Sequence, residues 1–211
     1  MARDTQPKCR KCRRAGEKLF IKGDRCNSPK CAMVKHPYAP GAHGSKPTRG
    51  GLSEYGSQLA TKQKLKRIYG ILESQFRKHF DEVKNKKGIT GDLFLTRLEM
   101  RLDNVVYRSG FATSRNQARQ LVNHKLIAVD GKNVTIPSYE VKLGQIISAN
   151  ASKENKNYFK NLDQVIKNKK DFPIWISFDS SKKQAKITGV PARDQIGINI
   201  DAQTIVEYYS R

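Results

Sequence analysis

Long apolar stretches are absent from this sequence of 211 residues, and so is an apolar N-terminal segment. No run of about 18 apolar residues is present, which excludes a helix that spans a bilayer. The N-terminus, MARDTQPK, lacks the apolar core of a secretory signal. We therefore expect a cytoplasmic protein without a membrane partner, in which thiols remain reduced and disulfides are rare.

Acidic residues are scarce, because 19 Asp and Glu stand against 41 Lys and Arg, for a formal net charge of +22. An excess this large repels itself in a compact fold and needs a polyanion nearby, for which nucleic acid is the first candidate. The excess is densest in residues 1–50, which hold 13 basic and three acidic residues. This part of the chain is therefore expected to bind anions most strongly.

Signatures of catalysis are also missing from the sequence. Its four histidines are scattered singly. There is no Gly-rich phosphate loop, no nucleophile elbow and no His and carboxylate pair at catalytic spacing. The sequence thus predicts a protein that is not an enzyme and has no small-molecule substrate.

The four cysteines are confined to one short basic segment. Two residues separate Cys9 from Cys12, four separate Cys26 from Cys31, and 13 residues lie between the pairs. Two closely spaced thiol pairs joined by a loop suit a tetrahedral site, and four thiolates hold zinc in closed structural sites. We therefore expect one structural Zn²⁺ held by all four cysteines. An iron–sulfur cluster is the alternative, disfavoured because no redox partner motif is present.

Two histidines follow the cysteines, His36 and His43. We interpret both as non-ligands of the metal, because four thiols already complete the site. The segment HPYAPGAHG around them is rich in Pro and Gly and predicts an extended, irregular loop.

The middle of the chain predicts helices with basic sides. Residues 53–87 have helical periodicity, with Ser53 as a cap and a break at Gly70. The basic residues on the polar side of the first part are Lys62, Lys64, Lys66 and Arg67. We interpret that side as facing RNA phosphates, with a merely solvated face as the alternative. Residues 90–109 predict a further helix.

Residues 114–149 predict a helix followed by a small sheet. Ser114 and Gln117 form a capping box that starts a helix at Arg115. The stretches LIAV and NVTI predict two strands, and the Asp-Gly pair between them is a hairpin signal. A third strand is expected at QIISA, and the fold class is therefore α+β.

Four arginines lie off the apolar stripes of these helices, namely Arg101, Arg108, Arg115 and Arg119. Arginine suits phosphate binding because its planar fork can pair bidentately with phosphate oxygens. We therefore expect all four to contact RNA. The alternative is that one or two of them only pair with acids such as Asp103.

The stretch RLDNVVYRSGFATSRNQARQLVNHKLIAVDGKNVTIPSYEVKLG resembles the small RNA-binding module shared by certain ribosomal proteins, pseudouridine synthases and tyrosyl-tRNA synthetases. Further motifs are KLFIKGDRC, SPKCAM, YAPGAHG, QKLKRIYG and the terminal EYYSR. Together with the cysteines they cover almost the whole chain. The sequence is similar to the bacterial small-subunit ribosomal protein number four family, in its zinc-binding, four-cysteine form.

The resemblance implies a fold with three parts. Residues 1–45 would form a basic segment with a zinc knuckle, and residues 46–97 with 176–211 a discontinuous, mainly helical body. Residues 98–175 would form the inserted RNA-binding module of two helices and a small antiparallel sheet. The tail would hold a strand at WISFD, a loop at KKQAKITGVPARDQ and a capped helix at DAQTIVEYYSR that packs on the body.

The resemblance also implies a function. The chain would be a ribosome-bound structural constituent of the small subunit and a primary rRNA binder that nucleates assembly of the 5′ domain. It would lie near the site where mRNA enters and affect translational accuracy. Its partners would be small-subunit rRNA, neighbouring small-subunit proteins including number five, and mRNA itself.

The residues expected to contact RNA come from every basic part of the chain. They are Arg10, Arg13, Arg14, Lys22, Arg25, Lys30, His43, Lys62, Lys64, Lys66, Arg67, Tyr69, Arg101, Arg108, Ser114, Arg115, Gln117, Arg119, Gln120, Lys125 and Lys132.

Two other functions compete with this interpretation. An RNA-modifying enzyme with the same module would need a large catalytic domain, whereas the remaining segments here are short and helical. A zinc-containing regulator that binds RNA or DNA would need a recognition helix poised for base edges. The basic residues instead spread over the entire length, which suits the many phosphates of a folded RNA.

Overall fold

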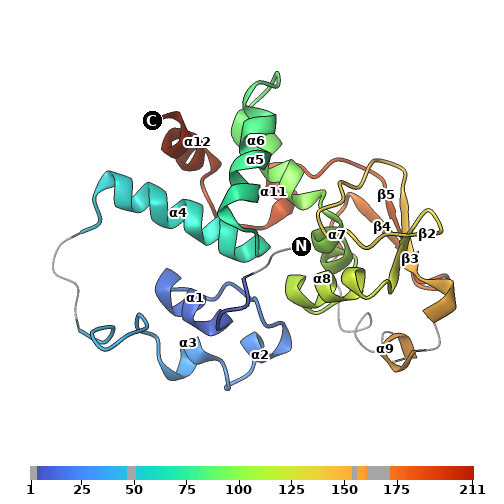
Figure 1. The fold of residues 1–211 in the computed structure, drawn as a ribbon, viewed down its shortest axis with the longest axis horizontal. Coiled ribbons are helices and arrows are strands. Elements are labelled where there is room, and N and C mark those ends of the chain that lie inside the picture. Colours follow the sequence, from blue (N-terminus) through green and yellow to red (C-terminus); the bar gives the residue numbers. More distant parts are fainter. Residues whose placement is uncertain (1–3, 47–50, 154–155, 161–171) are drawn as a thin grey trace. The chain divides into compact units, whose positions relative to one another are not determined.

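The computed structural model describes residues 4–46, 51–153, 156–160 and 172–211 (Figure 1). They form two compact units. Unit 1 comprises Met1–Phe94 with Ile198–Arg211, and unit 2 comprises Leu95–Gly197. In the part of the chain that the structure describes, no helix is both long and apolar enough to cross a membrane.

The N-terminal part of unit 1 consists of three short helices, α1 (Lys8–Ala15), α2 (Asp24–Asn27) and α3 (Ala32–Lys35). Helix α1 ends at Gly16, whose φ of 74° is the left-handed conformation that glycine adopts without strain. Cys12, Leu19 and Ile21 form a small buried core, against which Met33 and Ile68 pack. So few apolar residues cannot hold a fold of this size alone.

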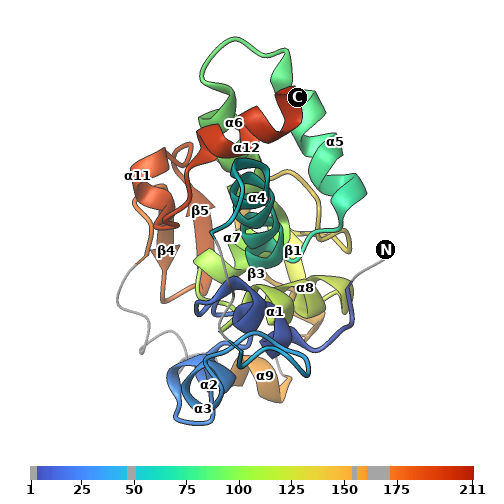
Figure 2. The ribbon, with the colours of Figure 1, turned by 90° about the vertical axis from the view of Figure 1, so that its left-hand side faces the viewer.

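The rest of unit 1 is a helical body of α4 (Glu54–Tyr69), α5 (Glu73–Lys84), the first part of α6 (Thr90–Glu99) and α12 (Ala202–Ser210) (Figure 2). The remainder of α6, from Leu95, belongs to unit 2. Helix α4 starts at the predicted cap, because the Ser53 hydroxyl accepts a hydrogen bond from Gly56 N–H, and it ends at Gly70. The C-terminal helix α12 packs against α4 as expected. The aromatic core contains Phe76, Phe80, Phe94 and Tyr209.

One carboxylate joins three of these helices. Glu73, at the start of α5, accepts hydrogen bonds from Lys62 Nζ at 2.6 Å and Lys66 Nζ at 2.7 Å, both on α4. The hydroxyl of Tyr209 on α12 donates a third at 2.9 Å. Burial alone would raise the pKa of Glu73, but these three hydrogen bonds outweigh it and lower the pKa to about 2.

Unit 2 packs two helices and a sheet around one core. Helices α7 (Leu102–Arg108) and α8 (Arg115–Asn123) pack against each other. The sheet is antiparallel throughout, in the order β2-β1-β3-β5-β4. Its strands are β1 (Ile127–Val129), β2 (Lys132–Asn133), β3 (Ile146–Ala149), β4 (Ile176–Asp179) and β5 (Gln184–Ile187). Short helical segments are η1 (Ala151–Lys153), α9 (Asn157–Lys160) and α11 (Arg193–Ile196).

The core of unit 2 lies between the helices and the sheet. Val105 of α7, Val122 of α8, Ile147 of β3 and Ala185 of β5 are fully buried there. The indole of Trp175, just before β4, completes this core. The expected α+β fold, with a helical body and a small antiparallel sheet, is therefore confirmed, whereas the zinc knuckle stays a prediction.

The predicted helix over residues 90–109 is wrong at one point, because the structure divides it into α6 and α7. Arg101 between them is extended, with ψ of 138°, and forms a β-bridge with Glu140. The backbone N–H of Leu102 donates to the carbonyl of Tyr139 at 2.8 Å. Backbone pairing with a distant loop thus overrides the local helical periodicity.

The predicted part boundaries also differ from the structure. The family resemblance predicts that residues 176–187 belong to the body, but β4 and β5 extend the sheet of unit 2. The stretch QAKI alternates half-buried or exposed polar residues with buried apolar ones, which is a strand pattern too short to stand out in a basic loop. The predicted segment 1–45 and the body lie together in unit 1. Of the predicted strand NVTI only Asn133 lies in a strand, because β2 comprises Lys132–Asn133.

The contacts of Glu73 predict an acid-sensitive fold. Its pKa in the folded chain lies below the ordinary value of 4.5, so its stabilising effect is complete above about pH 4.5 and is lost as the pH falls toward about 2. Glu73→Gln should lower the free energy of unfolding at pH 7 and remove this part of the acid dependence. Urea denaturation at a series of pH values measures both effects.

The control for this experiment is Asp81→Asn. Asp81 faces Arg77 across an exposed pair at 3.9 Å, so its loss should have little effect on unfolding at any pH. An acid dependence that is the same in Glu73→Gln as in the unsubstituted chain would contradict the prediction.

Candidate RNA interface and thiol site

The four cysteines lie around one cavity in unit 1. Cys9 and Cys12 are one turn apart on α1, Cys26 is in α2, and Cys31 immediately precedes α3. All four are free thiols, and all but Cys9 are buried. The chain thus brings together the two cysteine pairs that the spacing singled out.

The chemistry of this thiol site fits a soft divalent metal, whereas its geometry is not that of a closed ligand cage. In the described ranges, no group of three or more His, Cys, Asp or Glu side chains is arranged so that it could hold a metal ion. Burial raises the pKa of Cys12, a hydrogen bond from the Leu19 backbone acts in the opposite direction, and the other three thiols raise the pKa further. A bound cation would instead favour the Cys12 thiolate. The zinc site therefore stays a prediction.

Most of the predicted RNA contacts around the thiol site are exposed. These residues are Arg10, Arg14, Lys22, Arg25, Lys30 and His43. Arg13 differs, because its guanidinium donates to the carbonyl of Tyr38 at 2.8 Å and to that of Ala39 at 3.2 Å, and lies over the Tyr38 ring. Arg13 therefore orders the loop rich in Pro and Gly that follows α3.

The basic residues of α4 are largely engaged within unit 1. Lys62 is 4 % exposed, and both Lys62 and Lys66 contact Glu73. Lys64 pairs with Glu17 at 2.7 Å. Tyr69 is buried, and Arg67 is half-buried. The predicted phosphate-facing side of α4 is thus partly an internal packing surface, and its contacts with RNA stay a prediction.

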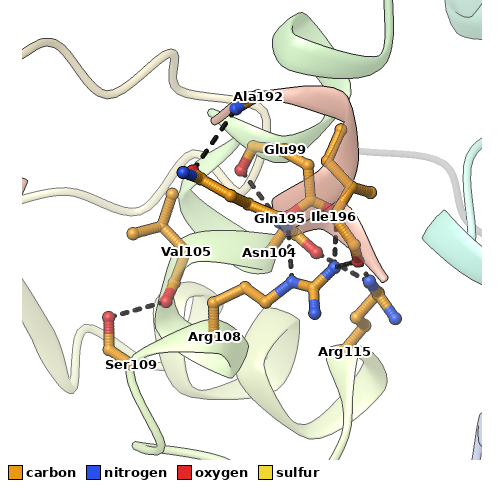
Figure 3. A network of polar contacts seen from close by, with 9 residues as sticks. All are labelled: Glu99, Asn104, Val105, Arg108, Ser109, Arg115, Ala192, Gln195 and Ile196. Carbon is orange, nitrogen blue, oxygen red and sulfur yellow. Dashed lines mark hydrogen bonds and ion pairs between the residues drawn. The ribbon is translucent and has the colours of Figure 1, made fainter. Parts of the chain in front are cut away.

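In unit 2, Glu99 is the centre of a network of polar contacts (Figure 3). Its fully buried carboxylate accepts from Arg108 at 2.9 and 3.0 Å and from Asn104 Nδ2 at 2.8 Å. Arg115 lies 3.7 Å from the same carboxylate and donates to Asn104 Oδ1 at 2.7 Å. Arg108 also donates to the carbonyl of Ile196. The network joins α6, α7, α8 and α11.

The other two arginines of the predicted set surround Asp103. Arg101 donates to both carboxylate oxygens, at 3.2 and 2.9 Å, and Arg119 lies 3.8 Å away. All three side chains are buried. All four predicted arginines therefore pair with acids within the chain, and their contacts with RNA stay a prediction. A signal was present in the sequence, since Glu99 and Asp103 are the only acids among residues 97–119.

The remaining predicted residues of unit 2 are of two kinds. Ser114 caps α8 as expected, because its hydroxyl accepts from Gln117 N–H at 3.3 Å, and Gln117 in turn accepts from Thr113 N–H. Both side chains thus have structural partners. The second kind comprises side chains exposed to solvent, namely Gln120, Lys125 and Lys132.

The network around Glu99 predicts a large loss of stability when its carboxylate is removed. Glu99→Ala leaves Arg108 and Arg115 partly buried without their anion, and breaking a buried ion pair costs about 3–5 kcal/mol. Chemical denaturation monitored by Trp175 fluorescence would measure the loss.

Glu140→Ala is the matched control in the same unit. Glu140 is exposed and pairs with Arg97 at 3.2 Å, so its removal should cost about 1 kcal/mol or less. Equal losses for the two variants would contradict the assignment of Glu99 to a buried structural network.

Comparison with known proteins covers the whole chain. A family model described as "Ribosomal protein S4/S9 N-terminal domain" matches residues 3–99, and one described as "S4 domain" matches residues 100–147. The chain is 47 % identical over 211 residues to the "Small ribosomal subunit protein uS4" of Solidesulfovibrio magneticus. It is 49 % identical over 212 residues to that of Pelotomaculum thermopropionicum and 48 % over 211 residues to that of Thermus thermophilus.

Each of these similarities covers 100 % of this chain and 100 % of the relative. The predicted family and the prediction that the chain is not an enzyme are thereby confirmed. The chain belongs to the small ribosomal subunit protein uS4 family: it is a ribosome-bound structural constituent of the small subunit in the cytoplasm that binds rRNA.

Proposed function

We propose that this chain is a primary binder of small-subunit rRNA that nucleates assembly of the 5′ domain. The observation that carries the proposal is how the charges are distributed. Scarce acids such as Glu73, Glu99 and Asp103 are used in contacts inside the units, while cations such as Arg25 and Lys125 are exposed. The surplus of positive charge therefore faces outward on both units, as a large contact with RNA requires.

We further propose that the chain lies near the site where mRNA enters and contacts neighbouring small-subunit proteins, including number five. The surface formed by α4 and α12 suits a protein partner. Tyr55 stacks on Tyr208, and Gln58 bridges Glu54 and Glu207. The exposed acids disfavour contact with a phosphate backbone, and the tyrosine rings suit a protein interface. An effect on translational accuracy would follow from this position.

We also propose one structural zinc at the thiol site, held by Cys9, Cys12, Cys26 and Cys31. The shared cavity and the small core of this segment support it. When bound, zinc would supply the cross-link that so small a core cannot provide. An iron–sulfur cluster is the less favoured occupant, because the sequence contains no redox partner motif.

The proposal of a large RNA contact predicts a steep dependence of affinity on salt. Single-stranded polymers give a slope near −0.7 in log K against log salt per phosphate contact, so about ten contacts imply a slope near −7. Replacing Lys125 and Lys132 with Gln should flatten the slope by about 1.4. Filter binding to small-subunit rRNA at several salt concentrations measures it.

The control for charge alone is Lys78→Gln, which removes an exposed cation outside the predicted contacts. It should leave the slope unchanged. Recognition of RNA shape further requires that random RNA of equal length competes poorly. Equal affinity for random RNA at physiological salt would reject a specific rRNA binder.

The zinc proposal predicts one zinc per chain in metal analysis of the purified protein. Structural four-thiolate sites stabilise small folds by roughly 10–16 kcal/mol. Cys26→Ser should therefore release zinc and unfold the segment of α1 to α3, while the amide signals of unit 2 stay unchanged. Asn27→Ser is the control at the adjacent position. Protein purified without zinc, or with two disulfides, would reject the proposal.

A further inference from the structure

A short turn between α1 and α2 has a strained backbone. Phe20 has a φ of 49°, in the left-handed region that residues other than glycine adopt at a cost in free energy. Its ring is 49 % exposed, so burial of the side chain does not account for this conformation. The neighbouring side chains of Leu19 and Ile21 are buried with Cys12 in the small core of this segment. The backbone of the turn is therefore anchored on both sides of Phe20.

This turn directs backbone N–H groups at two of the four thiols. The N–H of Lys22 donates to Cys26 Sγ, with 3.4 Å between the nitrogen and the sulfur. A backbone hydrogen bond from Leu19 reaches the Cys12 thiol. Cys12 belongs to the first cysteine pair and Cys26 to the second. One turn, centred on Phe20 between the two donors, thus contacts both halves of the thiol site.

A second left-handed residue leads from the turn into α2. Gly23, which precedes α2, has a φ of 59°, and its carbonyl accepts a hydrogen bond from Cys26 N–H at 2.8 Å. Ile21 and Lys22 therefore lie between two residues with positive φ. Cys26 is held twice, through its sulfur by Lys22 and through its backbone by Gly23.

We propose that the left-handed turn at Phe20 orients the thiol site, because the N–H groups of Leu19 and Lys22 position one sulfur of each cysteine pair for the metal. The inference rests on the proposed zinc and specifies which groups of the chain position its ligands. Four sulfur donors suit zinc. Groups that hydrogen-bond to metal ligands fix their orientation. Phe20 is accordingly a positioning residue that acts through its backbone conformation and not through its ring.

NMR of the full chain loaded with cadmium tests the two contacts directly. Zinc is exchanged for an NMR-active cadmium isotope, which also prefers sulfur donors, and coupling between the metal nucleus and amide protons is measured. A hydrogen bond from an N–H group to a metal-bound sulfur transmits this coupling. The amide protons of Leu19 and Lys22 should both couple to cadmium. Coupling at only one of these amides, or at neither, would overturn the inference.

Two substitutions at Phe20 separate the role of the backbone from that of the ring. Phe20→Gly and Phe20→Val both remove the exposed ring, but glycine adopts a positive φ freely, whereas a β-branched residue does not. Phe20→Gly should bind zinc as tightly as the unsubstituted chain. Phe20→Val should lose about tenfold to 100-fold in zinc affinity, the usual effect of removing a partner of a metal ligand. Competition with a chromogenic chelator measures these affinities in the full chain.

Lys18→Val is the matched control, because it places the same valine at a nearby exposed position whose φ is not positive. It should leave the zinc affinity unchanged. Equal losses in Phe20→Gly and Phe20→Val would mean that the ring, and not the turn, supports the site. Unchanged affinity in both variants would mean that the turn has no such role.

The cadmium measurement uses the unsubstituted chain, so it decides the inference even where Phe20→Val does not fold. It also distinguishes the turn from the proposed zinc itself. Cadmium bound without coupling to the two amides would reject the role of the turn alone. A chain that binds neither zinc nor cadmium would reject the zinc proposal and the role of the turn together.

Discussion

The interaction on which the structure most depends is the pairing of buried carboxylates with arginines and lysines. An ion pair at the surface adds little to stability, even in a chain with a net charge of +22. Glu99 and Asp103 instead lie inside unit 2, where each contacts two arginines, and Glu73 joins three helices of unit 1. Removing one partner from such a pair leaves a buried charge without compensation, which is why these acids are expected to dominate stability.

This pairing also decides which cations are available to RNA. Arg101 and Arg119 are held around Asp103 in the core of unit 2, whereas Lys125 and Lys132 project from its exposed side. Arginines next to a phosphate could still share their fork between an internal acid and RNA. The structure thus separates arginines that are buried in unit 2 from lysines whose side chains are exposed. Both kinds nevertheless lie in the same basic stretch of the sequence.

Much of the architecture could be predicted from short-range signals. The caps at Ser53 and Ser114, the break at Gly70 and the position of β1 follow from local rules of turns and helix ends. The confinement of the cysteines to one segment likewise anticipated their shared cavity. Family resemblance added the ribosomal function, which composition alone could not distinguish from other nucleic-acid binding.

What could not be predicted depends on contacts distant in sequence. The break between α6 and α7 exists because Arg101 pairs with Glu140 through the backbone, 39 residues away. That break places Glu99 and Asp103 among the arginines, so the role of those arginines could not be read from helical spacing. The contact of Lys62 with Glu73 could not be predicted for a similar reason, since Glu73 follows the turn at Gly70.

The central claim is that the outward-facing charge of both units recognises one folded region of rRNA. Hydroxyl-radical footprinting of small-subunit rRNA with the full chain tests it most directly. The account predicts protections clustered within the 5′ domain that persist in excess random RNA. Protections scattered over the whole rRNA, or removed by random RNA, would contradict it.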